Sequence, residues 1–332
     1  MNKQTSEQLK GIAILLVVIG HLFVTKFINT TNPAFNYLGA QGVAIFLILS
    51  GYGITSSYLT KGLDKSFLGR RLRTVLLPYS LVTLVWFLYD NSRGTTYPLR
   101  TILLSLFGLD FKLTMDGTMW YIFFILMWYF IFYLLFSLKL PTILKVGLLF
   151  GFAYLLRYHS RFNLTEVVYW QWGLHAIMFP IGSLLALVPL ESFSKQTLKL
   201  GFGLMGTMGL VTYLLNYRDN ALGLGPYMLS NLGFALVAFS VLMILGQLGY
   251  YSWLLGFIGS ISYELYLLEA VFMYKFSLPY VLPNKVLSLG IYLLALVAGS
   301  LLLKRGMKQL LLIFSHRQEL NPENTLGPGF VK

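Results

Sequence analysis

Residues 117–137 read GTMWYIFFILMWYFIFYLLFS, a run of 21 residues without a single charge. About 20 apolar residues in a helix span the hydrocarbon core of a membrane, so this run predicts a transmembrane helix. Nine further apolar runs are bounded by polar, proline or charged clusters and also predict spans. The ten predicted spans are about 7–27, 38–60, 72–90, 117–137, 141–158, 170–189, 196–216, 226–248, 252–275 and 285–312. We therefore expect an all-α, polytopic membrane protein with about ten transmembrane helices.

The composition supports this class of protein. Of the 332 residues, 57% are hydrophobic and 11% are charged, whereas roughly 25% of an average soluble domain is charged. The ten spans leave only short connections, so no separate soluble domain is expected. The apolar segment 101–109 is too short to cross a bilayer and predicts an interfacial or re-entrant helix.

The chain has no cysteine, which excludes disulfides, thiolate metal sites and a cysteine nucleophile. No metal site is expected. The formal net charge of +13 would favour nucleic-acid binding in a soluble protein. Here the basic residues lie between apolar runs, so they report orientation, and membrane lipids rather than a nucleic acid are the expected surroundings.

Counting lysine and arginine on alternate sides of the ten spans predicts the orientation. One side, which includes both termini, receives 16 of these residues and the other side nine. The excess of positive charge marks the cytoplasmic side of the membrane. We therefore expect a plasma-membrane protein with both termini in the cytoplasm. We expect an integral-membrane domain over residues 1–314 and a loosely ordered cytoplasmic tail over 315–332, which is polar and contains two prolines.

Lys10 and His21 are ionisable residues within the first span. They are eleven residues apart, which is 20° more than three full helical turns, so both lie on one face about 16 Å apart. One interpretation is a channel with a cation at its cytoplasmic mouth and an acid/base group in the outer half of the membrane. The other is a snorkelling lysine and a histidine bonded to a neighbouring helix.

Three arginines, Arg70, Arg71 and Arg73, lie at the start of the third predicted span. Such a cluster can serve membrane topology alone. It can also form an anion site, because guanidinium groups three residues apart on one helix face suit phosphate oxygens. A phosphate that enters from the cytoplasm indicates a nucleotide, a lipid headgroup or coenzyme A.

Glu264 and Glu269 lie within the ninth predicted span. Helical geometry puts Glu269 near the depth of His21, where a carboxylate could orient the imidazole or bind a substrate hydroxyl. It could also be an acid near the outer headgroups. The two glutamates are 140° apart around the helix, so at most one of them points at His21.

Aromatic residues surround the outer ends of two predicted spans, with His175 after Trp170 and Trp172, and Trp120 before Tyr121. Aromatic side chains at this depth usually form an interfacial belt. The alternative is an outward-facing platform for a sugar ring, with Trp120 and His175 as substrate-binding residues.

Four segments resemble the integral-membrane acyltransferase-3 family of bacterial O-acyltransferases. Residues 7–21, EQLKGIAILLVVIGH, are similar to the family's Arg-Gly-Ile-Ala start and its Arg-x10-His motif, with Lys10 in place of arginine. Residues 42–52, GVAIFLILSGY, resemble its Phe-Phe-x-Leu-Ser-Gly-Tyr run, and residues 67–79, FLGRRLRTVLLPY, keep an Arg-x-x-Arg pair and the end Pro78-Tyr79. Residues 261–269, ISYELYLLE, have glutamate where the family commonly has histidine.

The resemblance implies transfer of an acyl group, most often acetyl, from coenzyme A to a hydroxyl of an envelope glycan or its lipid-linked precursor. His21 is then the catalytic residue, as a base or as the group that accepts the acyl, with Glu269 beside it. The residues expected to bind the acyl-CoA are Lys10, Arg70, Arg71, Arg73 and Tyr79. The donors considered for the developing oxyanion are Ser50, Tyr52 and Trp120.

Two other classes of function fit the same residues. A proton-coupled transporter or flippase for a glycan or lipid would use His21 and Glu269 as a proton relay. A non-catalytic partner of a polysaccharide synthase would tolerate the loss of His21. The spacing of Lys10 and His21 favours the enzyme over both.

Overall fold

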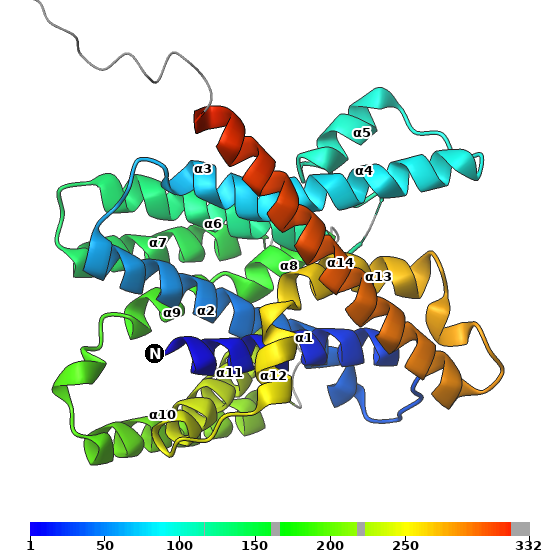
Figure 1. The fold of residues 1–332 in the computed structure, drawn as a ribbon. Helices are drawn as coiled ribbons and strands as arrows, with labels where there is room; N and C mark the ends of the chain where they lie inside the picture. The colour runs from blue at the N-terminus through cyan, green and yellow to red at the C-terminus, as the bar shows by residue number, and fades with distance from the viewer. Residues whose placement is uncertain (116, 161–166, 218–222, 320–332) are drawn as a thin grey trace, which may run out of the picture. The chain divides into compact units, whose positions relative to one another are not determined.

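The computed structural model describes residues 1–115, 117–160, 167–217 and 223–319, and every regular element in these ranges is helical (Figure 1). The chain divides into two compact units, Met1–Ser262 and Tyr263–Lys332, which are treated separately. The helices of the first unit are α1 (Lys3–Val24), η1 (Pro33–Tyr37), α2 (Leu38–Lys61), α3 (Phe67–Arg71), η2 (Leu72–Leu76), α4 (Leu77–Ser92), α5 (Leu99–Leu106), α6 (Trp120–Ser137), α7 (Thr142–Ser160), α8 (Val167–His175), α9 (Met178–Leu185), η3 (Leu190–Ser192), α10 (Lys195–Asn216), α11 (Leu224–Gln247) and α12 (Trp253–Ser260). Those that follow are α13 (Ser262–Tyr274), η5 (Leu278–Tyr280) and α14 (Lys285–Glu319).

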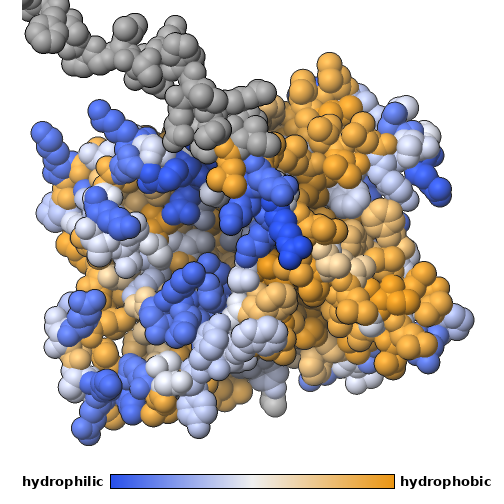
Figure 2. Space-filling model, viewed as in Figure 1, coloured by the Kyte–Doolittle hydropathy of each residue, from blue (hydrophilic) through white to orange (hydrophobic). Residues whose placement is uncertain are grey.

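Seven helical segments in the described residues are long and apolar enough to cross a membrane, and α12 with α13 makes an eighth if the pair is one span. The seven are Lys3–Val24, Ala34–Lys61, Phe67–Ser92, Trp120–Ser137, Lys195–Asn216, Leu224–Gln247 and Lys285–Leu312. The prediction of an all-α, polytopic membrane protein is confirmed. Apolar side chains cover much of the face in view in Figure 2, as a protein in contact with lipid requires.

Every one of the ten predicted spans contains helix, but three of them differ from a simple membrane span. The span predicted at 252–275 is broken at Ile261 into α12 and α13. The span predicted at 141–158 is α7, whose apolar character is lowered by Lys145, Arg157 and His159. The span predicted at 170–189 is broken into α8 and α9 between His175 and Met178. The segment 101–109 overlaps the short helix α5, Leu99–Leu106, and its interfacial or re-entrant position stays a prediction.

At the C-terminus, α14 continues to Glu319, five residues into the segment predicted as a tail. The rest of that segment, 320–332, lies outside the described residues. The domain boundary at residue 314 therefore stays a prediction.

The third predicted span begins earlier than expected, at Phe67, and contains a π-helical stretch over Leu72–Leu76. Pro78 follows directly and has no N–H to give to the preceding turn, which favours a wider hydrogen-bonding pattern there. Single π-helical turns within α-helices often occur at functional sites. This one includes Arg73 and follows Arg70 and Arg71.

Glycines hold α1 against its neighbours at main-chain distance. A Cβ on Gly20 would lie 2.5 Å from the amide nitrogen of Gly39 at the start of α2. A Cβ on Gly11 would overlap the carbonyl of Leu255 in α12. The two contacts fix α1 between α2 and α12, with the His21 end of α1 beside the first turn of α2.

A glycine also allows α9 and α2 to pack at main-chain distance. Gly182 of α9 faces the main chain of Ile48, and a methyl group at position 182 would overlap the carbonyl of Ile48. Gly182→Ala is therefore expected to lower the thermal unfolding midpoint of the detergent-solubilised protein, because overpacking a tight contact costs about 1–3 kcal/mol. Gly53→Ala is the matched control on α2, since position 53 has open space around it.

Alanine at position 53 is expected to leave the midpoint unchanged or raise it, because glycine costs a helix up to about 1 kcal/mol relative to alanine. Equal midpoints for the two variants would contradict the tight α2–α9 contact.

Candidate functional site

His21 lies in the last turn of α1, where the backbone carbonyls at the C-terminus of a helix favour positive charge. Its side chain is half-buried, and its own carbonyl accepts hydrogen bonds from the amide and the hydroxyl of Thr25, both at 2.9 Å. Because Gly20 packs on Gly39, His21 is held beside the start of α2. Lys10 is half-buried on the same unbroken helix, so the predicted one-face register of Lys10 and His21 is compatible with the structure.

His175 reaches the same end of α2 from α8. The ring is fully buried (0% exposed), with Nδ1 at 2.9 Å from the carbonyl oxygen of Gln171 and Nε2 at 3.1 Å from that of Ala40. A carbonyl only accepts, so the imidazole can donate to both only when both nitrogens carry protons. No ring nitrogen remains for a ligand in this arrangement.

Trp120, at the start of α6, stacks on His175 with ring centroids 5.3 Å apart. Both side chains are buried, so neither presents a ring face outward as the sugar-platform hypothesis requires. His175 nevertheless contacts the first turn of α2, His21 follows the glycine that packs there, and Trp120 stacks on His175.

A group of three hydroxyls lies further along α2 and α6. The side chains of Tyr121 and Tyr129 of α6 both lie close to the hydroxyl of Ser50 on α2. Tyr129 is 7% exposed, whereas Ser50 and Tyr121 are half-buried. Apart from Ser50, these residues were not predicted as site residues, although an eight-residue spacing leaves Tyr121 and Tyr129 only 80° apart around a helix.

The side chains of the three arginines, Arg70, Arg71 and Arg73, have different surroundings. The guanidinium of Arg71 lies over the rings of Tyr129 and Phe67, 5.2 and 5.4 Å from their centroids. Arg70 instead forms an ion pair with Asp64 and a hydrogen bond with Ser66. Arg73 is exposed in the π-helical turn. Arg70 and Arg73 therefore do not form the joint phosphate fork that their spacing suggests, and Arg71 is the member that faces the protein interior.

Asp64 keeps its negative charge because of these contacts. Hydrogen bonds from Ser66 and from the Arg70 guanidinium hold the pKa of the Asp64 carboxyl well below its usual range. The Asp64 carboxylate is therefore charged at neutral pH and forms an ion pair with Arg70.

These contacts form one continuous path through the first unit. Their order is Arg71, Tyr129, Ser50, Tyr121, Trp120, His175 and the main chain of Ala40. Eleven residues separate Gly39 from Ser50, which is about 16 Å along α2. The path thus connects the arginine cluster with the end of α2 at which His21 lies.

This distance corrects the oxyanion hypothesis for two residues. Ser50 is about 16 Å from Gly39 along α2, and Tyr52 is further still, so neither lies beside the helix end that holds His21. The hydroxyl of Tyr52 accepts a hydrogen bond from the Met1 amine at 2.9 Å and its ring packs near Phe239. Trp120 remains as the predicted donor at the His21 end.

Tyr79, a predicted acyl-CoA ligand, is buried between two helices. Its hydroxyl donates to the carbonyl of Ser105 at 2.6 Å and so ties α4 to α5. In the structure, Tyr79 therefore has a packing role, because its hydrogen bond holds α5 against α4.

Glu269 lies in the second unit, on α13, and is fully buried (0% exposed). The Tyr292 hydroxyl donates to the main-chain carbonyl of Glu269 at 3.4 Å, a neighbour that the sequence did not indicate. Because the two units are described separately, the pairing of Glu269 with His21 stays a prediction. Among the described residues, no three histidine, aspartate or glutamate side chains are grouped so that they could hold a metal ion.

A comparison with protein-family models matches residues 5–305 to the acyltransferase-3 model, which describes an acyltransferase domain. Searches of the curated proteins and of the solved structures found no significant match. The matched range contains every residue of the path above and the whole of α13 with Glu269.

Proposed function

Because this chain belongs to the acyltransferase-3 family, and is thus a membrane acyltransferase, we propose that it transfers an acyl group from cytoplasmic acyl-CoA to a hydroxyl of a cell-envelope or exported glycan. Acetyl is the proposed group, and the plasma membrane of a bacterial cell is the proposed location. The distribution of lysine and arginine supports a cytoplasmic location for both termini.

The observation that carries this proposal is the path from Arg71 to the first turn of α2. In the proposed orientation, the arginine cluster faces the cytoplasm and His21 lies toward the outer side. Arg71 offers a guanidinium to a donor phosphate, and the hydroxyls of Ser50, Tyr121 and Tyr129 provide polar contacts on the way to His21. A donor with phosphates at one end and a long flexible arm has the length to extend beside these packed side chains, from Arg71 toward His21.

His21 supplies the proton chemistry at the far end. As a base, its imidazole takes the proton of the acceptor hydroxyl while that oxygen attacks the thioester carbonyl carbon. The carbon–sulfur bond breaks, an ester forms, and coenzyme A leaves and receives a proton as its thiol. The alternative, in which the imidazole first accepts the acyl group itself, has the same overall balance.

The experiment is an assay of thiol release from acetyl-CoA by the purified protein with candidate glycans, compared with its His21→Ala variant. Glycan-dependent thiol release that the variant lacks supports the proposal. Proton-driven movement of a glycan or lipid across proteoliposomes, without thiol release, would overturn it in favour of a transporter.

Ser50 supplies a more detailed prediction about the path. Ser50→Ala is expected to raise the KM for acyl-CoA about 3- to 10-fold with little change in kcat, because a typical protein hydrogen bond contributes about 0.5–1.5 kcal/mol. Ser50→Thr keeps the hydroxyl and should restore the KM, and Ser57→Ala is the control at an exposed position of α2. A fall in kcat with unchanged KM would place Ser50 at the reacting atoms instead.

A further inference from the structure

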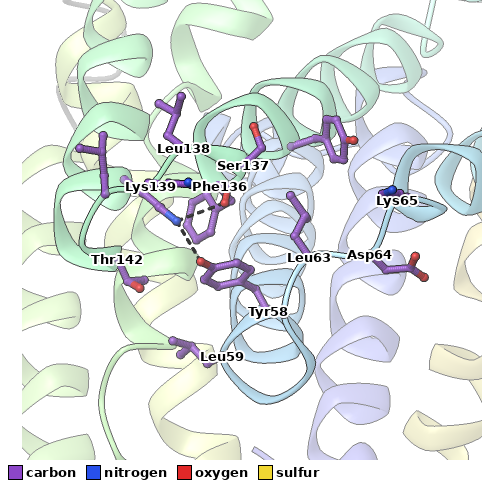
Figure 3. Close-up of a pocket in the computed structure, with 14 residues that line it drawn as sticks. Tyr58, Leu59, Leu63, Asp64, Lys65, Phe136, Ser137, Leu138, Lys139 and Thr142 are labelled. Carbon is purple, nitrogen blue, oxygen red and sulfur yellow. Dashed lines mark hydrogen bonds between the residues drawn. The ribbon is translucent and has the colours of Figure 1, made fainter.

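A groove in the first unit lies apart from the path. It has a volume of about 800 Å³ and is lined where α2 and α6 end and α7 begins, together with the connection after α2. Figure 3 shows Lys65 and Lys139 on opposite sides of it, with Tyr58 and Leu63 between them. A groove of this size can hold a small molecule or a headgroup.

Its base contains a buried ammonium group. Lys145 of α7 is only 4% exposed, and its Nζ donates to the Tyr58 hydroxyl at 2.9 Å and to the Phe136 carbonyl at 3.1 Å. The same nitrogen lies 5.1 and 5.7 Å from the centroids of the Tyr58 and Phe136 rings. An ammonium has three N–H donors, so these two hydrogen bonds leave one donor for a ligand.

In the part of the chain that the structure describes, no carboxylate forms an ion pair with Lys145. Asp64 is the only acidic residue among those that line the groove, and its carboxylate pairs with Arg70. A buried charge is costly unless an opposite charge accompanies it, so the arrangement is suited to an anion that comes from outside the chain.

The rim of the groove carries further positive charge and further hydrogen-bonding groups. Lys65 and Lys139 are exposed lysines, and the hydroxyls of Ser137 and Thr142 are further lining groups. Leu59 and Leu138, at the ends of two apolar helices, are also exposed at the rim. Positive charge beside exposed leucines at the helix ends is the pattern of a site at the surface of a membrane.

We propose that this groove binds a phosphate-bearing ligand, held by Lys145 at its base and by Lys65 and Lys139 at its rim. The phosphate has two possible sources, the headgroup of an anionic phospholipid and the nucleotide half of an acyl-CoA donor. The nucleotide source rests on the proposed function, and the lipid source does not.

Two variants and a matched control test the proposal. Lys145→Met removes the buried charge at similar length, and the double variant Lys65→Gln/Lys139→Gln changes two exposed residues. The control is Lys195→Gln/Lys199→Gln on α10, which removes two lysines from the same predicted face of the membrane. Each protein is tested for retention of phosphatidylglycerol in phosphatidylcholine nanodiscs, by native mass spectrometry, and for binding of 3′,5′-ADP, by calorimetry.

We expect the affinity for one of the two probes to fall about 10-fold or more in each groove variant, because hydrogen bonds to charged groups are strong. The control should bind like the unchanged protein. A loss for phosphatidylglycerol identifies the headgroup, and a loss for 3′,5′-ADP identifies the nucleotide. Equal binding by the double groove variant and the control would overturn the proposal.

Neither measurement requires turnover, so the two proposals can fail separately. A protein that transfers no acyl group but binds a probe through the groove contradicts only the proposed function. A protein that transfers acyl groups but binds neither probe through the groove contradicts only this inference.

Discussion

His21→Gln is expected to lower kcat for acyl transfer by about 100- to 10,000-fold, the usual range for loss of a general acid or base. Glutamine keeps much of the polarity and size of histidine but cannot take up a proton at neutral pH. The half-buried position of His21 at the end of α1 means that the substitution opens no large cavity, so the unfolding midpoint should change little. Initial rates of thiol release, with both substrates saturating, measure the effect.

His159→Gln is the matched control for this experiment. His159 is an exposed histidine in the last turn of α7, and its loss should leave kcat near the unchanged value. If His21→Gln retains full activity while folded, His21 has no part in the proton transfer and the mechanism proposed above is wrong.

Arg71→Gln is expected to raise the KM for acyl-CoA about 10- to 100-fold while kcat and the KM for the acceptor change little, since hydrogen bonds to charged groups contribute about 1.5–3 kcal/mol. The direction of the side chain makes Arg71 the member of the cluster with the largest effect. Its guanidinium lies over Tyr129 at the start of the path, whereas the guanidinium of Arg70 is held by Asp64 and Ser66. Arg71→Lys keeps the charge but not the flat stacking group, so an intermediate KM is expected.

Arg70→Gln and Arg73→Gln are the comparison variants, and each should change the KM for acyl-CoA less than Arg71→Gln does. Equal increases for all three would indicate a general attraction of anions by the cluster. If the three variants alter only membrane insertion or topology, the arginines act through the distribution of positive charge alone.

The sequence predicts most of the helices because apolar runs bounded by polar clusters are local features. The run 117–137 corresponds to α6 at Trp120–Ser137, and the continuity of α1 follows from the same pattern. The positions of Lys10 and His21 on one helix need no tertiary information.

The features that the sequence did not predict depend on contacts between distant segments. The buried ring of His175 contacts the carbonyl of Ala40, which is 135 residues away in the sequence. Nothing near residue 175 in the sequence indicates this partner. The different directions of Arg70 and Arg71 likewise depend on Asp64 for one and on Tyr129 of α6 for the other.

In the sequence, Lys145 is one of the 16 lysines and arginines on the side expected to be cytoplasmic, with no other feature of its own. Its burial follows from α6 and α2, which supply the carbonyl of Phe136 and the hydroxyl of Tyr58. A basic residue at the start of a membrane helix is common, so the sequence offers no signal that separates this lysine from the others.

The glycine contacts of α1 limit how this molecule can move. Helices that meet through side chains can slide past one another by repacking, but Gly11 and Gly20 bring main chain against main chain at two points of α1. These close main-chain contacts keep His21 at one depth relative to α2. They leave little room for the rocking of helix bundles by which transporters expose a site to each side of the membrane in turn. In the mechanism proposed above, His21 therefore stays in place and the acyl group moves to it, on the flexible arm of the donor, from the level of Arg71.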